Sequence, residues 1–188
     1  MTTISDLGKS TNDWSDAQNW SGGVIPGAAD TVIIKYQVDV TTAEAAENLT
    51  VGGLVFSATG QLTVNSLTVG TPPGTGISIQ MNGGSLTAGA LTFSSSLPLI
   101  ELTYGTFDVQ SAAPTSWSGS LSVGPVNGLP VTTGQSALLE FASGGIQMIE
   151  AGGTIAINGS ANYLADAGSL LSNSALSSLS SNLGSLNL

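Results

Sequence analysis

An imperfect repeat between residues 60 and 109 constrains the fold of this chain most strongly. Segments 60–69 and 84–93 read Gly-Gln-Leu-Thr-Val-Asn-Ser-Leu-Thr-Val and Gly-Ser-Leu-Thr-Ala-Gly-Ala-Leu-Thr-Phe, and 101–109 is a looser copy. Each copy has two apolar anchors five residues apart, and each anchor starts a short alternation of apolar and polar residues. Such alternation is typical of a strand that buries one face. The first anchors are Leu62, Leu86 and Leu102, and the second anchors are Leu67, Leu91 and Phe107.

The repeat predicts an all-β protein whose copies stack on one another. A single copy cannot bury its apolar face, so each copy needs a neighbour for its stability. We therefore predict a single-stranded right-handed parallel β-helix, or β-solenoid, with Leu62, Leu86 and Leu102 in one column. The alternative is an antiparallel β-sandwich, because Gly144-Gly145, Gly152-Gly153 and Asn158-Gly159 separate three short strands and fit hairpin turns.

The 188 residues are enough for one domain with a continuous core. We expect an N-terminal cap with the first strands (1–41), regular repeats (42–109), an irregular excursion (110–136) and C-terminal coils (137–188). Residues 42–48 have helical propensity but are too few for a helix, so we expect a corner there. Near the other end we expect a helical turn at 174–178 and a strand at 185–188.

The strand at 185–188 ends on Leu-Asn-Leu and leaves an apolar rung uncovered. Solenoids normally finish with a polar cap. The uncovered rung predicts either a fragment of a longer array, in which neighbouring repeats cover it, or self-association through the C-terminal end.

The charge balance excludes several classes of partner. The chain is 41% hydrophobic and only 7% charged, with a net charge of −10. Lys9 and Lys35 are the only cationic side chains. Since so few cations cannot neutralise phosphates, we expect no nucleic-acid partner. No apolar run approaches the ~20 residues of a membrane helix, so we expect no membrane insertion.

Cysteine and histidine are both absent. Their absence excludes disulfides, thiolate metal sites and Ser–His or Cys–His catalysis. The first residues lack a charged start followed by an apolar run, so we expect no signal peptide of the usual secretory kind.

The N-terminal part carries a resemblance to a known group of proteins. The pattern is Trp14, Asn19-Trp20-Ser21, Gly23, Pro26, Asp30 and Val32-Ile33. It resembles the opening of repeats in bacterial autotransporter-type β-solenoid passengers and related adhesin-like surface proteins, some of which carry Hint domains. The resemblance implies an extended extracellular β-structure with a structural or adhesive role, and it supplies no catalytic motif.

Three tryptophans are the candidate carbohydrate contacts. Trp14, Trp20 and Trp117 could offer aromatic platforms for a sugar ring. The simpler interpretation of Trp14 and Trp20 is that they cover the first coil, while Asn19 and Asp30 bond to turn amides.

Acidic residues raise two further hypotheses. Asp13 and Asp16, with backbone carbonyls, could begin the oxygen shell of a calcium ion, although no EF-hand or nonapeptide spacing is present. Glycosidase chemistry needs two facing carboxylates, for which Glu101 with Asp108 or Glu140 with Glu150 are the candidates. The simpler interpretation is solvated charge and outward strand positions, so we assign no catalytic residue, no metal ligand and no cofactor.

A row of threonines could bind ice if it lay on one flat face. These are Thr63, Thr68, Thr87, Thr92 and Thr103. The unequal spacing of the copies favours threonines that simply face water on a β-favouring backbone.

These observations predict a non-catalytic structural or adhesive segment of a bacterial extracellular or cell-surface protein. Its partners would be a host or matrix surface and glycans. The alternatives are a carbohydrate-binding module and a β-helix enzyme that acts on polysaccharide.

Overall fold

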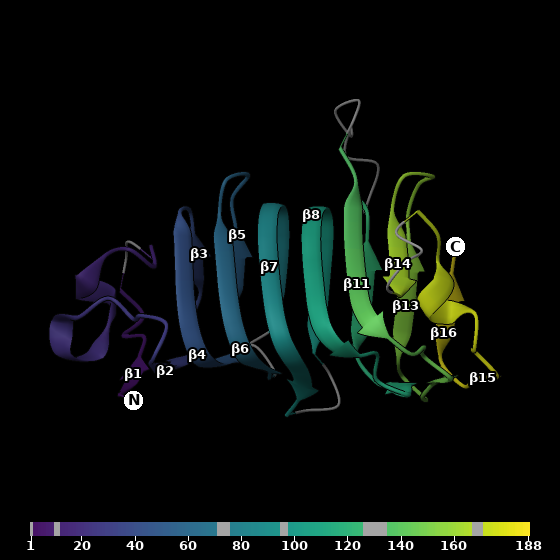
Figure 1. The fold of residues 1–188 in the computed structure, drawn as a ribbon, viewed down its shortest axis with the longest axis horizontal. Helices are drawn as coiled ribbons and strands as arrows, with labels where there is room; N and C mark the ends of the chain where they lie inside the picture. The colour runs from purple at the N-terminus through teal and green to yellow at the C-terminus, as the bar shows by residue number, and fades with distance from the viewer. Residues whose placement is uncertain (1, 10–11, 71–75, 95–97, 126–134, 167–170) are drawn as a thin grey trace.

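The chain folds into an all-β structure, as predicted. The computed structural model describes residues 2–9, 12–70, 76–94, 98–125, 135–166 and 171–188. Strands make up 55% of it and helices 5%. The N- and C-termini lie at opposite ends of a row of strands (Figure 1).

The strands vary widely in length. They are β1 (Thr3–Ser5), β2 (Thr31–Ile34), β3 (Val38–Val40), β4 (Ala43–Val51), β5 (Leu54–Phe56), β6 (Gln61–Val69), β7 (Ile79–Phe93), β8 (Leu99–Ala112), β9 (Ser116–Trp117), β10 (Ser120–Val123), β11 (Ala137–Ser143), β12 (Met148–Ile149), β13 (Thr154–Ile157), β14 (Tyr163–Asp166), β15 (Ser181–Asn182) and β16 (Ser185–Asn187). Three short 3-10 helices are η1 (Ala17–Asn19), η2 (Ser21–Gly23) and η3 (Ser174–Leu176).

Every pairing between strands in the described ranges is parallel. The pairings form a 13-stranded sheet and a separate three-stranded sheet in the order β15-β12-β9. The antiparallel β-sandwich is therefore the wrong alternative. The hairpin alternative at the glycine pairs is also wrong, because the three strands do not pair with one another. β11 pairs with β8 and β14, β12 pairs with β9 and β15, and β13 pairs with β10 and β16.

The large sheet is organised in three columns of stacked segments. Column A holds β3, β5, the first part of β7 and of β8, β10, β13 and β16. Column B holds 43–46, 61–64, 85–88, 106–109, β11 and β14. Column C holds β1, β2, 48–51, 66–69 and 90–93. The long strands β4 and β6 cross from column B to column C, and β8 crosses from A to B.

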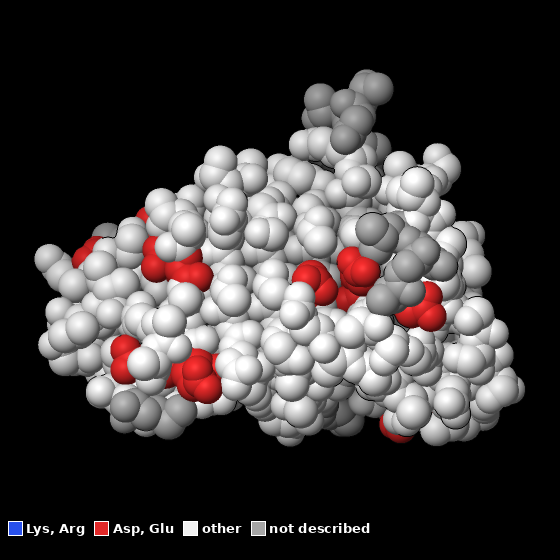
Figure 2. All heavy atoms as spheres, viewed as in Figure 1, with Lys and Arg blue, Asp and Glu red and all other residues white. Residues whose placement is uncertain are grey.

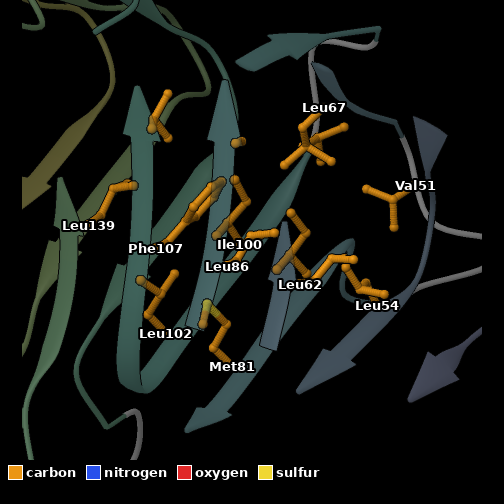
Figure 3. Packing of buried hydrophobic residues seen from close by; sticks show 14 of the residues in the cluster. Val51, Leu54, Leu62, Leu67, Met81, Leu86, Ile100, Leu102, Phe107 and Leu139 are labelled. Atoms are coloured by element: carbon orange, nitrogen blue, oxygen red, sulfur yellow. The ribbon is translucent and has the colours of Figure 1, made fainter. Parts of the chain in front are cut away.

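The first two copies of the repeat stack as predicted, and the third does not. Leu62 pairs with Leu86, and Leu67 pairs with Leu91. The next residue in the Leu62–Leu86 column is Phe107, whereas Leu102 pairs with Met81 in column A. The anchor spacing of five residues caused the error, because it fits both the bend from column B to C and the bend from column A to B. Figure 3 shows Leu62, Leu86 and Phe107, and also Met81 and Leu102, in the interior.

The core is one cluster of buried hydrophobic side chains that runs from Ile4 to Ala175. Column A alone contributes a continuous inward row, Val38, Leu54, Ile79, Ile100, Leu121, Ile155 and Leu186. Alternate residues of these strands face outward, as the short apolar–polar alternations require.

Residues 43–48 belong to strand β4 and form no helical turn, and β4 itself bends from column B to column C between Ala46 and Asn48. β4 pairs with β6 over nearly its whole length, and Ala46 and Leu49 are buried in the core. Backbone pairing and burial outweigh the weak helical preference of seven residues. The predicted helical turn and final strand are confirmed by η3 and β16. The irregular excursion contains β9 and β10, and its residues 126–134 lie outside the described ranges.

Glycines form the corner between columns A and B. Gly84 has φ +69°, and a Cβ atom there would lie 2.0 Å from the carbonyl oxygen of Gly60. At the next glycine in the corner, Gly105, an added Cβ atom would lie 2.7 Å from the carbonyl oxygen of Gly84. Neighbouring chain segments therefore approach each other at this corner more closely than any side chain allows.

Candidate functional site

The three tryptophans are all fully buried. Trp14 and Trp20 meet edge to face with their ring centroids 5.0 Å apart, and Trp20 Nε1 donates a hydrogen bond to the carbonyl oxygen of Trp14 at 2.7 Å. Trp117 packs edge to face on Phe93 at 5.1 Å. None of these rings presents a face to solvent, so a sugar cannot stack on them in this structure. Their burial corrects the predicted carbohydrate contacts. The packing of Trp14 on Trp20 fits the simpler interpretation given for these two residues, in which they cover the first coil.

The acidic residues near the N-terminus hold the backbone of the first turns. The Asp6 carboxylate is buried and accepts hydrogen bonds from the amides of Lys35 at 2.6 Å and Tyr36 at 3.0 Å. Asp30 accepts from the amides of Gly27 and Thr2. These carboxylates fix local turns with the acceptor oxygens that a metal would need.

Asp13 is the predicted calcium ligand with the most complete set of protein partners. Burial works to raise its pKa, but hydrogen bonds from the hydroxyl and amide of Ser15 and from the Thr41 hydroxyl outweigh burial, and the pKa is lowered. Asp16 accepts from the amide of Gln18. Among the described residues no group of three or more His, Cys, Asp or Glu side chains is placed to hold a metal ion.

The predicted carboxylate pairs are not brought together. Glu101 lies in column A and Asp108 in column B, on either side of the bend in β8. Glu140 lies in column B, and Glu150 follows β12 in the small sheet. Burial raises the pKa of Glu101.

A different pair, Asp108 and Glu140, lies side by side. The two residues are register partners on the adjacent parallel strands β8 and β11. Burial and the charge of Asp108 raise the pKa of Glu140, while Gln110 Nε2 donates a hydrogen bond to Asp108 Oδ2 at 2.9 Å. Figure 2 shows acidic side chains where these strands lie next to each other. Sequence reasoning missed this pair because more than 30 residues, including the irregular excursion, separate its members.

A shallow groove of about 300 Å³ crosses β4, β6, β7 and β8 beside this pair. Its polar lining comes from Glu47, Thr63, Asn65, Thr87 and Gln110. Asn65 Nδ2 donates to Glu47 Oε1 at 3.1 Å, and Gly89 adds no side chain to the lining. The groove offers amide and hydroxyl groups together with the Glu47 carboxylate, and all of these can form hydrogen bonds with neutral polar ligands.

The threonines do not share one flat face. Thr63 pairs with Thr87 in column B, whereas Thr68 pairs with Thr92 in column C. The hydroxyl oxygens of Thr68 and Thr92 lie 3.0 Å apart, within hydrogen-bond distance. The ladder is divided between two columns, and part of it is hydrogen-bonded within the protein.

Comparison with known proteins gives no family assignment: no protein-family model, curated protein or solved structure matches the chain. Within the described ranges, no helix has the length and apolar character needed to cross a bilayer.

Proposed function

We propose that this chain is a non-catalytic structural or adhesive segment of a bacterial extracellular or cell-surface protein, folded as a right-handed parallel β-helix. Its role would be to extend and present a polar surface to a host or matrix surface and its glycans. The observation that carries the proposal is the set of three strand columns, which gives a row of stacked segments with few charges on their outward positions.

The column registers support the solenoid. Successive segments of the chain return to the same columns, and each return is parallel to the segment beside it. Connections between parallel strands of one sheet are right-handed in about 98% of cases, which supports the right-handed form. The stacked corner glycines and the apolar row of column A are consistent with this winding.

The surface composition supports a binding or structural role in the extracellular space. Outward positions of columns B and C carry Thr63, Ser66, Thr68, Thr87 and Thr92. Hydroxyl and amide side chains keep the protein in water with little charge, and they can hydrogen-bond to neutral glycans through the groove beside Asn65.

Adhesion of coated beads tests the proposal. Beads that carry the full chain are offered to extracellular-matrix proteins and a glycan array. Asn65→Ala and Gln110→Ala remove polar groups from the groove, and Gln80→Ala is the matched control on column A, outside the groove. We expect adhesion that the groove variants weaken and the control does not. Adhesion equal in all variants would contradict the role of the groove, and no adhesion to any surface would contradict the adhesive function.

The Asp108–Glu140 pair favours one second candidate, an enzyme that acts on polysaccharide. A pair of carboxylates is the minimum for general acid–base cleavage of a glycosidic bond, and the raised pKa of Glu140 suits it to act as the general acid. Release of reducing ends from a polysaccharide panel, abolished by Asp108→Asn and by Glu140→Gln, would establish this candidate. The leading proposal expects no turnover by the unmodified chain.

A further inference from the structure

We propose that the face formed by β15, β16 and the leucines beside them binds the same face of a second copy of this chain, in a two-fold symmetric dimer. This face comprises Ser181–Asn182, Leu183, Ser185–Asn187 and Leu188, and we call it the β16 face. It is independent of the groove and of the Asp108–Glu140 pair, so its failure would leave the proposed function untouched.

The β16 face has strand edges without partners. β16 pairs with β13 and β15 pairs with β12, and no strand in the described part of the chain pairs with their outer edges. An unpaired edge presents backbone N–H and C=O groups that can pair with another chain. Column B offers no such edge at this end, because Asn173 Oδ1 and Ser174 Oγ accept hydrogen bonds from the amides of Leu164 and Asp166 in β14.

The same face exposes apolar surface. Leu183 is 66% exposed and Leu188 is 72% exposed. Leu186 pairs with Ile155 and is the last residue in the inward row of column A, where it is only partly buried. Apolar surface next to free strand edges is the combination that natural edge strands avoid by carrying charges or proline.

The distribution of charge identifies the occupant as a second β16 face. The chain has a net charge of −10 and two cationic side chains, so two copies repel each other over most of their surfaces. Residues 167–188 carry no charged side chain. Two copies can therefore approach through this face with no charged side chain of these residues between them, and both partners then offer the same two free edges.

The opposite end of the row is a poorer partner for this face. There, the edge of β3 is already occupied, because the Trp14 amide donates to the Asp39 carbonyl at 2.9 Å and the Asp39 amide donates to the Asn12 carbonyl at 2.7 Å. That end also contains most of the aspartates and both lysines. They are Asp6, Asp13, Asp16, Asp30, Asp39, Lys9 and Lys35. A head-to-tail contact would pair a free edge of column A with a blocked one.

The test is the mass in solution of the full chain, measured by sedimentation equilibrium. Loading concentrations run from ~1 μM to ~1 mM, which spans the Kd values of weak contacts. We expect a shift from the monomer mass of 18.7 kDa towards twice that value. Added salt should strengthen the dimer, because it screens the repulsion between the two acidic bodies.

Leu183→Asp is the discriminating variant, since it adds a carboxylate to the contact surface of each of the two copies. We expect at least a ~10-fold increase in the dimer Kd. Val24→Asp is the matched control, because Val24 is 58% exposed, lies in the N-terminal cap segment and receives the same added charge. Asn187→Asp on β16 is a second variant with the same expected effect, and circular dichroism checks that each variant is folded.

Three results would overturn the proposal. The first is a monomer throughout the concentration range. The second is an equal loss of association in Val24→Asp and Leu183→Asp, which would mean that net charge alone governs association. The third is growth beyond dimers, which would indicate a head-to-tail contact.

Discussion

Replacement of Gly84 by alanine should destabilise the protein far more than replacement of Gly22, although both glycines have positive φ. Gly84 has φ +69° and Gly22 has φ +82°. The left-handed backbone costs an alanine ~1–2 kcal/mol at either position. At Gly22 nothing lies within 4 Å of the added Cβ atom, so this strain is the whole cost.

At Gly84 the added Cβ atom would lie 2.0 Å from the carbonyl oxygen of Gly60. The two segments must separate by more than ~1 Å to restore van der Waals contact. This oxygen accepts a hydrogen bond from the Ser85 amide at 2.9 Å, and the separation would break that bond at a cost of ~1 kcal/mol. The separation also exposes apolar surface between Leu86 and Leu62, roughly that of one methylene group, at a cost of ~1 kcal/mol in the free energy of unfolding.

The expected loss in the free energy of unfolding is therefore ~3–4 kcal/mol for Gly84→Ala and ~1–2 kcal/mol for Gly22→Ala. Urea denaturation followed by far-UV circular dichroism and by tryptophan fluorescence measures both. Equal losses in the two variants would refute the close approach of the chain segments at this corner.

Four further predictions concern other parts of the structure. Asp6→Ala should lower the free energy of unfolding by about 2–4 kcal/mol, because the amides of Lys35 and Tyr36 lose a buried acceptor. Asp6→Asn keeps one acceptor oxygen and should lower the free energy of unfolding by less in the same urea titration. The pKa of Glu140 is raised in the folded state, so ionisation of this residue disfavours folding, and the free energy of unfolding should fall as pH rises from the ordinary pKa of 4.5 through the raised pKa. Glu140→Gln should flatten this dependence of stability on pH, measured by thermal melts over the same pH range. An unchanged dependence would contradict the cause assigned to the raised pKa. The pKa of Asp13 is lowered in the folded state, so the ionised carboxylate stabilises the fold, and the unmodified chain loses this stabilisation as pH falls below 3.8. Asp13→Asn should therefore lower the free energy of unfolding above pH 3.8. Acrylamide should quench the fluorescence of the folded protein weakly and that of the urea-unfolded protein strongly, since all three tryptophans are buried, and strong quenching of the folded protein would contradict their burial.

The sequence was most informative where the repeat is spelled alike in neighbouring copies. Segments 60–69 and 84–93 predicted the pairing of Leu62 with Leu86 and of Leu67 with Leu91, because equal spelling implies equal burial. The third copy was assigned to the wrong column, since a spacing of five between anchors is compatible with two different bends. Only the structure distinguishes those bends, by the corner glycines of the bend from column A to B.

The candidate site depended on information that local patterns do not carry. Asp108 and Glu140 meet because the chain returns to column B after the excursion at 110–136, and no periodicity in the sequence sets the length of that excursion. The burial of the tryptophans was one of two interpretations open from the sequence. The structure decided between them because Trp14 and Trp20 pack on each other beneath hydrogen-bonded turns.

The stacking of column A is the central claim, and distances between spin labels test it most directly. The chain has no cysteine, so introduced cysteines are labelled specifically. Three doubly labelled variants carry one label at Val55 and the second label at Glu101, Ala156 or Asn187. These three positions lie two, four and five strands from Val55 along the column. At ~4.8 Å per strand the backbone separations should be ~10, ~19 and ~24 Å, rising in proportion to the number of strands. A Val55–Asn187 distance no longer than the Val55–Glu101 distance would contradict the columns and the solenoid proposed from them.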